Sequence, residues 1–347
     1  MPTNDFTSIM SSITAGLTGD AKHDIAYLMS QAEAYKDHPL AKEVARECGR
    51  MMWDLMPEDA KAEFDQALDD DGADLHEAME KAHQLCGEGR VEEALAVLEP
   101  QARRLDDLLA SGWFADDSQS VYLDFDDMTD YAVWHAHTTE TREARMVTQP
   151  IAVVYMAYGS CLYDLGRYAE AVEALHKAIR WNPASAQLRF ELAENYKRLG
   201  YMGACEAALE AAYPCVANGA QMAKWHRERA FVAVERGQLE LAAAHLVASM
   251  AFEPSDLAVQ EMLYICEKFG RDFSQMSGGA AVRVLEERGR PVTADADTIA
   301  ALADLVAVLR DEGQLAEAAS VAGDVYDLTG DETARRAAEE LRAQAGE

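Results

Sequence analysis

The sequence lacks the features that mark membrane and secreted proteins. No apolar run approaches the 18 residues that a membrane-spanning helix requires. The first residues, MPTNDFTSIMSSITAGL, carry neither the basic stretch nor the long apolar segment of a secretory signal. The six cysteines are scattered without any C-x-x-C spacing, which favours reduced, buried thiols over a disulfide framework. We therefore expect a cytoplasmic protein without a membrane segment.

Positive charge is also scarce, with 31 Lys and Arg against 62 Asp and Glu. The deficit is uneven along the chain. Residues 1–151 hold 32 acids and 12 bases, residues 152–256 hold 12 and 10, and residues 257–347 hold 18 and 9. An acidic surface repels phosphate backbones, so we expect no nucleic-acid partner.

Catalytic fingerprints are missing as well. The chain has no nucleophile elbow, P-loop or dinucleotide-binding motif, so we expect no enzyme, no catalytic residue and no cofactor. His83 and Cys86 are three residues apart on one expected helix. A surface histidine and a core cysteine explain that pair more simply than a catalytic one.

Two patterns of potential ligands fail as metal sites. His135 and His137 form an H-x-H pair with no third ligand at a suitable spacing, although Asp130 and Glu140 are nearby in the sequence. The acidic run 124–130 resembles the start of a calcium loop but lacks its glycine and its glutamate at the twelfth position. We expect no metal site.

The stretch 155–183, YMAYGSCLYDLGRYAEAVEALHKAIRWNP, predicts two short helices folded against each other. Tyr155, Gly159 and Leu162 recur at i, i+4 and i+7, the spacing of one helical face. Gly166 supplies a left-handed residue that ends the first helix. The second helix is expected to end at Asn182, because a residue before proline is driven out of the α region.

The same pattern returns twice downstream. The offset is 34 residues and then 37, close to the period of a helical-repeat array. The matching positions are Ala193, Tyr196, Gly200, Leu209 and Ala212, and then Ala230, Gly237, Leu239, Ala242, Leu246 and Pro254.

These residues resemble the tetratricopeptide repeat (TPR) family, whose units are helix–turn–helix pairs of 34 residues. The first unit matches family positions at Gly159, Leu162, Gly166, Tyr168, Ala171, Ala178 and Pro183. The second unit lacks the closing proline, and the third has Ala233 where an aromatic is usual. The segment 181–197, WNPASAQLRFELAENYK, also resembles uncharacterised bacterial proteins with this repeat core. The resemblance implies an all-α fold, a superhelical array of antiparallel helix pairs (a TPR-like α-solenoid) with extra N- and C-terminal helices.

The expected division of the chain follows the rhythm of these pairs. It comprises an N-terminal helical segment (1–72), a degenerate TPR-like helix pair (73–110), an aromatic and acidic insertion (111–150), three TPR units (152–256), and C-terminal helices with a degenerate pair and a capping helix (257–347). The expected helices outside the core are 23–35, 39–56, 57–68, 257–269, 281–288, 297–311, 315–328 and 331–344. Residues 1–18 are expected to be loose or only partly helical, Gly278 and Gly279 to lie in a loop, and the insertion to hold a short strand or helix.

In this family the first helix of each pair lines a concave groove, which implies a peptide-binding site here. The expected groove residues are Met156, Ser160, Tyr163, Phe190, Glu194, Lys197, Arg198, Lys224, Arg227 and Phe231. Aromatic and basic side chains on one helical face suit a protein or peptide partner with an anionic or carboxylate-bearing segment. An ordinary solvated face with ion pairs along each helix is the alternative.

The function we expect is a protein–protein interaction scaffold that binds a peptide segment in that groove. The family's clamp for chaperone C-termini needs Lys and Asn where this chain has Met156 and Ser160, so such a partner is disfavoured. Two alternatives stay open at this point, a ligand- or peptide-responsive regulator and a self-assembling structural repeat protein.

Overall fold

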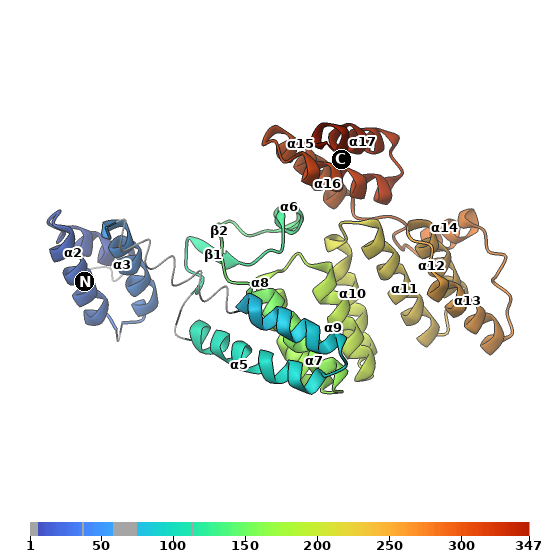
Figure 1. Cartoon of the computed structure of the whole chain (residues 1–347), viewed down its shortest axis with the longest axis horizontal. Coiled ribbons are helices and arrows are strands. Elements are labelled where there is room, and N and C mark those ends of the chain that lie inside the picture. Colours follow the sequence, from blue (N-terminus) through green and yellow to red (C-terminus); the bar gives the residue numbers. More distant parts are fainter. Residues whose placement is uncertain (1–5, 37, 58–74, 111, 113, 347) are drawn as a thin grey trace. The chain divides into compact units, whose positions relative to one another are not determined.

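The computed structural model describes residues 6–36, 38–57, 75–110, 112 and 114–346, and these residues are predominantly helical (Figure 1). The chain forms two compact units. One contains Met1–Ala78, Arg103–Tyr122 and Arg142–Pro150, and the other contains Met79–Ala102, Leu123–Thr141 and Ile151–Glu347. The all-α expectation is therefore confirmed.

The first unit begins with three helices, α1 (Phe6–Thr14), α2 (Ala21–Ala34) and α3 (Ala41–Leu55). Their apolar sides meet in a core of Ile9, Met10, Ile13, Leu28, Val44 and Cys48. Residues 1–18, expected to be loose or only partly helical, contain α1, whose three buried side chains recur at helical spacing and pack in this core. The helix expected at 57–68 lies outside the described residues except for Pro57.

The expected insertion contains two short strands and one helix. Strand β1 (Ser120–Leu123) pairs with β2 (Glu143–Met146), and α6 (Met128–His137) lies between them in sequence. Asp127 caps α6 by accepting hydrogen bonds from the backbone N–H groups of Thr129 and Asp130. The aromatic residues of this segment pack on one another, with the Phe125 ring centroid 5.7 Å from that of Trp134.

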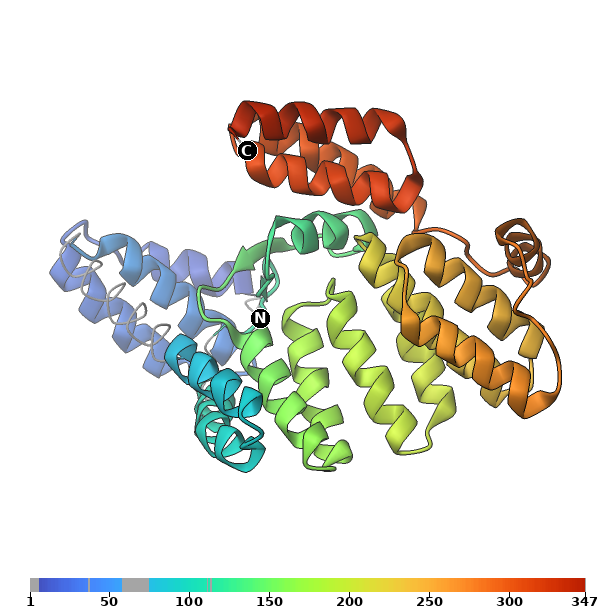
Figure 2. The same ribbon diagram turned by 45° about the vertical axis from the view of Figure 1, so that its right-hand side comes forward.

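The second unit holds the helix pairs. Residues 75–87 are helical and lead into α5 (Val91–Ala110), which continues through Pro100. The central pairs are α7 (Ile151–Asp164) with α8 (Tyr168–Trp181), α9 (Ala186–Arg198) with α10 (Met202–Ala212), and α11 (Gly219–Glu235) with α12 (Leu239–Phe252). A short 3-10 helix, η1 (Tyr213–Cys215), follows α10. Figure 2 shows α7 to α12 side by side in chain order.

Each pair is closed by the same turn. Gly166, Gly200 and Gly237 adopt positive φ angles of 73°, 74° and 69°. The residue after each glycine donates its N–H to the carbonyl five residues earlier, as from Arg167 to Leu162 at 2.8 Å. This is the Schellman motif, which satisfies carbonyl groups that the helix end leaves free. The same hydrogen bond recurs at Arg90, Tyr201, Gln238, Arg290 and Gln314.

Small residues allow the helices of a pair to approach closely. A Cβ added at Gly159 would lie 3.4 Å from the Leu175 side chain and 3.5 Å from the Ala171 carbonyl. Ala171 and Leu175 are themselves buried. The contact between α7 and α8 therefore depends on the glycine and alanine that the sequence pattern singled out.

The C-terminal helices are α13 (Asp256–Phe269), α14 (Gly278–Glu287), α15 (Ala296–Asp311), α16 (Leu315–Thr329) and α17 (Glu332–Ala345). The expected loop at Gly278 and Gly279 is wrong. Ser277 accepts a hydrogen bond from Ala280 N–H and starts α14 before the two glycines, which occupy its first turn.

Helices α15, α16 and α17 form a bundle that is fastened to η1 rather than placed next in the row of pairs (Figure 2). Tyr213 donates its hydroxyl to Thr293 O at 3.0 Å, and Thr298 donates its hydroxyl to Pro214 O at 2.6 Å. Helix α15 also packs against α6.

A buried histidine pair forms a hydrogen bond with the segment before α15, which leads into this bundle. His226 and His245 are 0% and 1% exposed, and their Nδ1 atoms are 2.9 Å apart. His226 Nε2 lies 3.2 Å from Val292 O, which can only accept. His226 therefore donates from Nε2 and accepts at Nδ1 from His245. His226 must stay neutral to accept this hydrogen bond, and burial lowers the pKa of His226 to about 4 and of His245 to about 2.

We predict that this pair makes the second unit sensitive to acid. Unfolded histidines titrate near pH 6.5, so below that pH the unfolded chain gains protons that the folded pair does not. Stability is then lost as the pH falls, by about 1.4 kcal/mol per pH unit for each histidine. Urea unfolding at pH 7 and pH 5, compared between the natural chain and His245→Gln, measures the effect. The natural chain should lose about 2 kcal/mol more than the variant, because the introduced amide cannot titrate.

The comparison with His245→Gln is needed because Asp124 and Asp130 change the stability with pH in the opposite direction. Burial raises the pKa of Asp124 to about 7 and of Asp130 to about 6, so these carboxyls reduce stability as the pH rises. Their effect is common to the natural chain and the variant. An equal pH dependence in the two proteins would contradict the assignment of the histidine pair.

A second prediction concerns the turns. Gly200→Ala places a Cβ in a left-handed conformation, which costs about 1–2 kcal/mol. Gly203→Ala is the matched control, because Gly203 is helical, exposed and has open space around its Cα. This control should leave stability unchanged or raise it by up to about 1 kcal/mol. Urea midpoints followed by circular dichroism decide the point, and similar midpoints for the two variants would be inconsistent with the turn model.

Candidate functional site

The predicted groove residues of α9 and α11, apart from Arg198, lie on one connected surface that continues onto α13. We call this surface the α9–α11–α13 face. It consists of Phe190, Glu191, Glu194, Lys197, Lys224, Arg227, Glu228, Phe231, Glu261 and Tyr264, together with Glu253 at the end of α12. Contacts between neighbouring repeats join the side chains of α9 and α11, and Glu261 of α13 is attracted by Lys197 and Arg227. Tyr264 follows Glu261 by three residues, about one helical turn.

The first of these contacts surrounds Lys224 of α11. Its Nζ lies 3.5 Å from Glu191 Oε1 and 5.1 Å from the centroid of the Phe190 ring, both on α9. Phe190 is fully buried, so its ring supports the lysine rather than presenting a free surface. Arg227, one turn further along α11, pairs with Glu253 at 3.3 Å.

A tighter cluster surrounds Lys197 of α9. Its ammonium lies 2.7 Å from Glu194 Oε1, contacts Glu228 of α11 and lies 4.6 Å from the centroid of the Phe231 ring. The side chains of Lys197 and Glu228 are only 12% and 10% exposed. One buried ammonium therefore bridges two carboxyl groups from different repeats.

The protonation of this cluster follows from its burial. Burial raises the pKa of Glu228 to about 7, against the attraction of Lys197. Burial acts the same way on Glu194, but Lys197 outweighs it and the pKa of Glu194 is lowered. Two carboxyls that share one ammonium in a dry site do not both ionise easily, so Glu228 is the one that takes a proton near neutral pH.

The residues predicted on the first TPR unit (152–185), and Arg198 of α9, lie differently. Arg198 donates from Nε to Tyr163 Oη at 2.9 Å and covers the Tyr163 ring, so it turns toward α7. Ser160 is exposed and donates its hydroxyl to Met156 O at 3.0 Å within the same helix. Among the described residues, no hydrogen bond or ion pair joins the side chains of Met156 or Ser160 to α9 or α11.

Sequence reasoning found Glu194 but missed the other carboxylates that partner these cations, Glu191, Glu228 and Glu253, and the whole contribution of α13. Glu261 of α13 is half-buried, and burial raises its pKa although the positive charges of Lys197 and Arg227 act against that rise. The signal in the sequence that could have identified α13 is the number of residues between an aromatic side chain and the next turn glycine. Tyr264 precedes Gly270 by six residues, as Phe231 precedes Gly237.

The charge balance of the face differs from the sequence expectation. The basic residues suggested a surface open to an anionic ligand. In the structure, Lys197, Lys224 and Arg227 each already hold a carboxylate of the chain. The face carries more carboxyl groups than cations, namely Glu191, Glu194, Glu228, Glu253 and Glu261.

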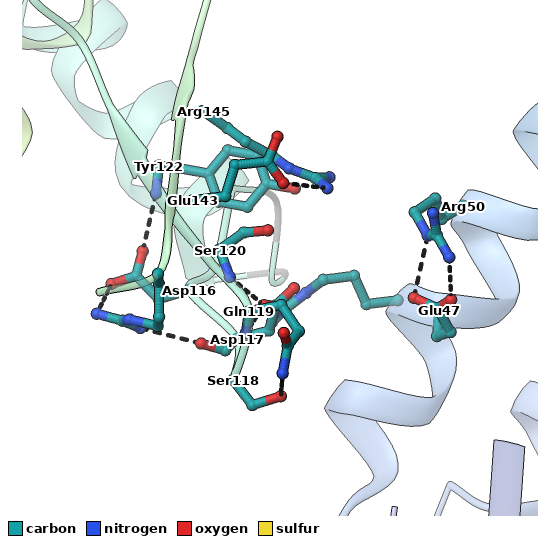
Figure 3. Close-up of polar contacts among 12 residues, drawn as sticks. Glu47, Arg50, Asp116, Asp117, Ser118, Gln119, Ser120, Tyr122, Glu143 and Arg145 are labelled. Atoms are coloured by element: carbon teal, nitrogen blue, oxygen red, sulfur yellow. Dashed lines mark hydrogen bonds and ion pairs between the residues drawn. The ribbon is translucent and has the colours of Figure 1, made fainter. Parts of the chain in front are cut away.

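A separate cavity lies in the first unit, between α3 and the two strands (Figure 3). Its volume is about 600 Å³. Arg46 lies 3.2 Å from Asp117, whose carboxylate also accepts the Gln119 and Ser120 N–H groups. Glu47 binds Arg50 on α3. The charged groups that line the cavity thus neutralise one another, and no predicted site residue lies there.

One group of potential metal ligands occurs among the described residues. His137, Asp295 and Asp297 place their ligand atoms within 4.8 Å of one another. However, the Thr298 hydroxyl donates to Pro214 O and can only accept from His137 Nε2, 2.7 Å away. Nε2 therefore carries a proton, and this group serves as a structural hydrogen-bond link. Asp130, which the sequence placed near the histidines, instead accepts from Asn182 Nδ2 at 2.6 Å.

The repeated pairs, their shared turn and their connected face define a helical-repeat protein. Residues 159–200 match the family model described as the TPR repeat. This segment therefore carries the tetratricopeptide repeat that the sequence resemblance predicted, and repeats of this family serve in general as scaffolds for protein–protein interaction. No curated protein matches the chain. Within the described ranges, no helix is long and apolar enough to cross a membrane.

The Lys197 cluster yields a prediction for stability. Lys197→Met removes the cation and leaves Glu194 and Glu228 buried together, which should cost about 3 kcal/mol at pH 8. The deficit should shrink by pH 6, because protonated Glu228 needs no cation. Urea unfolding at the two pH values measures this difference.

The control for that experiment is Lys197→Met combined with Glu228→Gln. The double variant carries a neutral amide in place of the second carboxylate. It should recover part of the stability at pH 8 and show little further gain at pH 6. Equal losses for single and double variants would show that the lysine contributes by packing alone.

Proposed function

We propose that the α9–α11–α13 face is the inner wall of a peptide-binding groove, and that the protein is an adaptor that binds a segment of a partner there. The observation that supports this most directly is the exposure of aromatic side chains at equivalent positions of two successive repeats. Phe231 is 36% exposed and Tyr264 is 51% exposed, although both are large and apolar. Aromatic anchors of this kind dominate the energy of many interfaces.

The charged residues support binding rather than catalysis. Each cation of the face is paired with a carboxylate. A network of this kind fixes side chains in position and offers hydrogen-bonding groups to a ligand. We therefore infer a scaffold without catalytic chemistry.

The anionic or carboxylate-bearing partner expected from the sequence is one form of this proposal. Such a segment has to displace Glu191, Glu194 or Glu253 from the cations that they hold. The exchange replaces one ion pair by another and yields little net energy. The ion pairs therefore weigh against an anionic partner. Measured affinities for acidic and basic peptides can distinguish the two kinds of partner.

We also propose a cytoplasmic location for the adaptor. The six cysteines are all free, and Cys48, Cys161, Cys205 and Cys215 are buried. Reduced, buried thiols of this kind fit a reducing compartment.

Selection from a displayed library of random 12-residue peptides tests the binding role. Peptides that bind the full chain are then measured against two variants. Phe231→Ala should weaken binding about tenfold or more, the effect of losing an interface anchor worth more than about 1 kcal/mol. Val308→Ala is the control, since Val308 is 48% exposed but lies on α15. Selected peptides that bind Phe231→Ala as tightly as the natural chain would refute the site.

A further inference from the structure

We infer that the partner segment is basic, and that the α9–α11–α13 face takes a lysine or arginine side chain of that partner beside Glu261. This inference rests on the proposed function, because it assigns a chemistry to the ligand of the same face. It reverses the charge that the sequence alone favoured for the partner.

The first argument is the local balance of charge. The Lys197 ammonium attracts three carboxyl groups, those of Glu194, Glu228 and Glu261. Arg227 also attracts Glu261, but its guanidinium is paired with Glu253 at 3.3 Å. Because Glu228 takes a proton near neutral pH, this part of the face then holds two cations and three ionised carboxylates, and a further cation beside Glu261 complements it.

The second argument is the state of Glu261 itself. The structure gives this half-buried carboxyl no hydrogen bond and no ion pair among the described residues. The cations that attract it are already bound by other carboxylates. A partly desolvated carboxylate without a partner is unfavourable, so a cationic group from a ligand would satisfy it.

The third argument comes from the aromatic rings of the face, each of which already attracts an ammonium. Lys224 lies over Phe190, Lys197 over Phe231 and Lys268 over Tyr264, with distances to the ring centroids of 5.1, 4.6 and 4.9 Å. Lys268 is exposed, so a cation of the partner can take its place over Tyr264. Rings and carboxylates on this face thus favour the same kind of ligand.

A peptide array tests the inference. Its members are 12-residue peptides in matched pairs that share every residue except that Lys and Arg in one member are Glu in the other. The full chain should prefer the basic members, and added salt should weaken their binding. Glu261→Gln should lower the affinity for the preferred peptides about tenfold, the change expected when one charge-assisted contact is lost.

The chain as a whole is strongly acidic, although residues 152–256 are nearly balanced, so a matched control must exclude general attraction of basic peptides. Glu312→Gln removes the same charge from an exposed glutamate at the end of α15 and should leave the affinity unchanged. Equal losses of peptide affinity in Glu261→Gln and Glu312→Gln would overturn the inference, because the overall charge and not a site at Glu261 would then attract the basic peptides.

The remaining outcomes separate this inference from the proposed function. If the chain prefers the acidic members and Phe231→Ala abolishes their binding, the face binds peptides but the partner is anionic, and only the inference is overturned. If no bound peptide of either charge depends on Phe231, the proposed function fails and the inference fails with it.

Discussion

The left-handed turn between paired helices is the constraint on which the α9–α11–α13 face depends. Because Gly166, Gly200 and Gly237 have nearly the same φ angle and one hydrogen-bond pattern, each first helix ends at the same point of its repeat. A residue at a fixed distance before the glycine then recurs on the same side of successive helices. Phe231 and Tyr264 are such a pair, so the turn decides which side chains share a surface.

The ion pairs of the face connect neighbouring repeats as well as shaping the surface. Lys197 of α9 reaches Glu228 of α11, and Lys224 of α11 reaches Glu191 of α9. Buried pairs of this kind contribute little net stability, because desolvation offsets their attraction, but the loss of one partner is expensive. We infer that they set how adjacent repeats align, so the residues that hold the repeats together also present the charges to a ligand.

Much of the fold could be predicted from the sequence, because it depends on local patterns. Turn glycines and small residues such as Gly159 locate the helix pairs within a few residues. Glu228 and Glu191, the partners of Lys197 and Lys224 on a neighbouring repeat, could not be predicted, since each lies about one repeat away and pairs only when the helices are packed. The position of α15 was equally hidden, because it depends on hydrogen bonds from Thr298 and Tyr213 to distant carbonyl groups.

Charge acts on two length scales in this protein, and both favour the same sign of partner. Close to Glu261, the excess of carboxyl groups acts over a few ångströms and determines where a cation is held. The formal net charge of −31 acts over a longer range, since it attracts cationic segments and repels anionic ones before contact. An anionic partner would have to overcome this repulsion and then displace carboxylates from their ion pairs. A basic partner is attracted before contact and finds the Glu261 carboxyl without an ion pair, although it has to displace Lys268 to reach the Tyr264 ring. Electrostatics therefore favours a basic partner in encounter and beside Glu261.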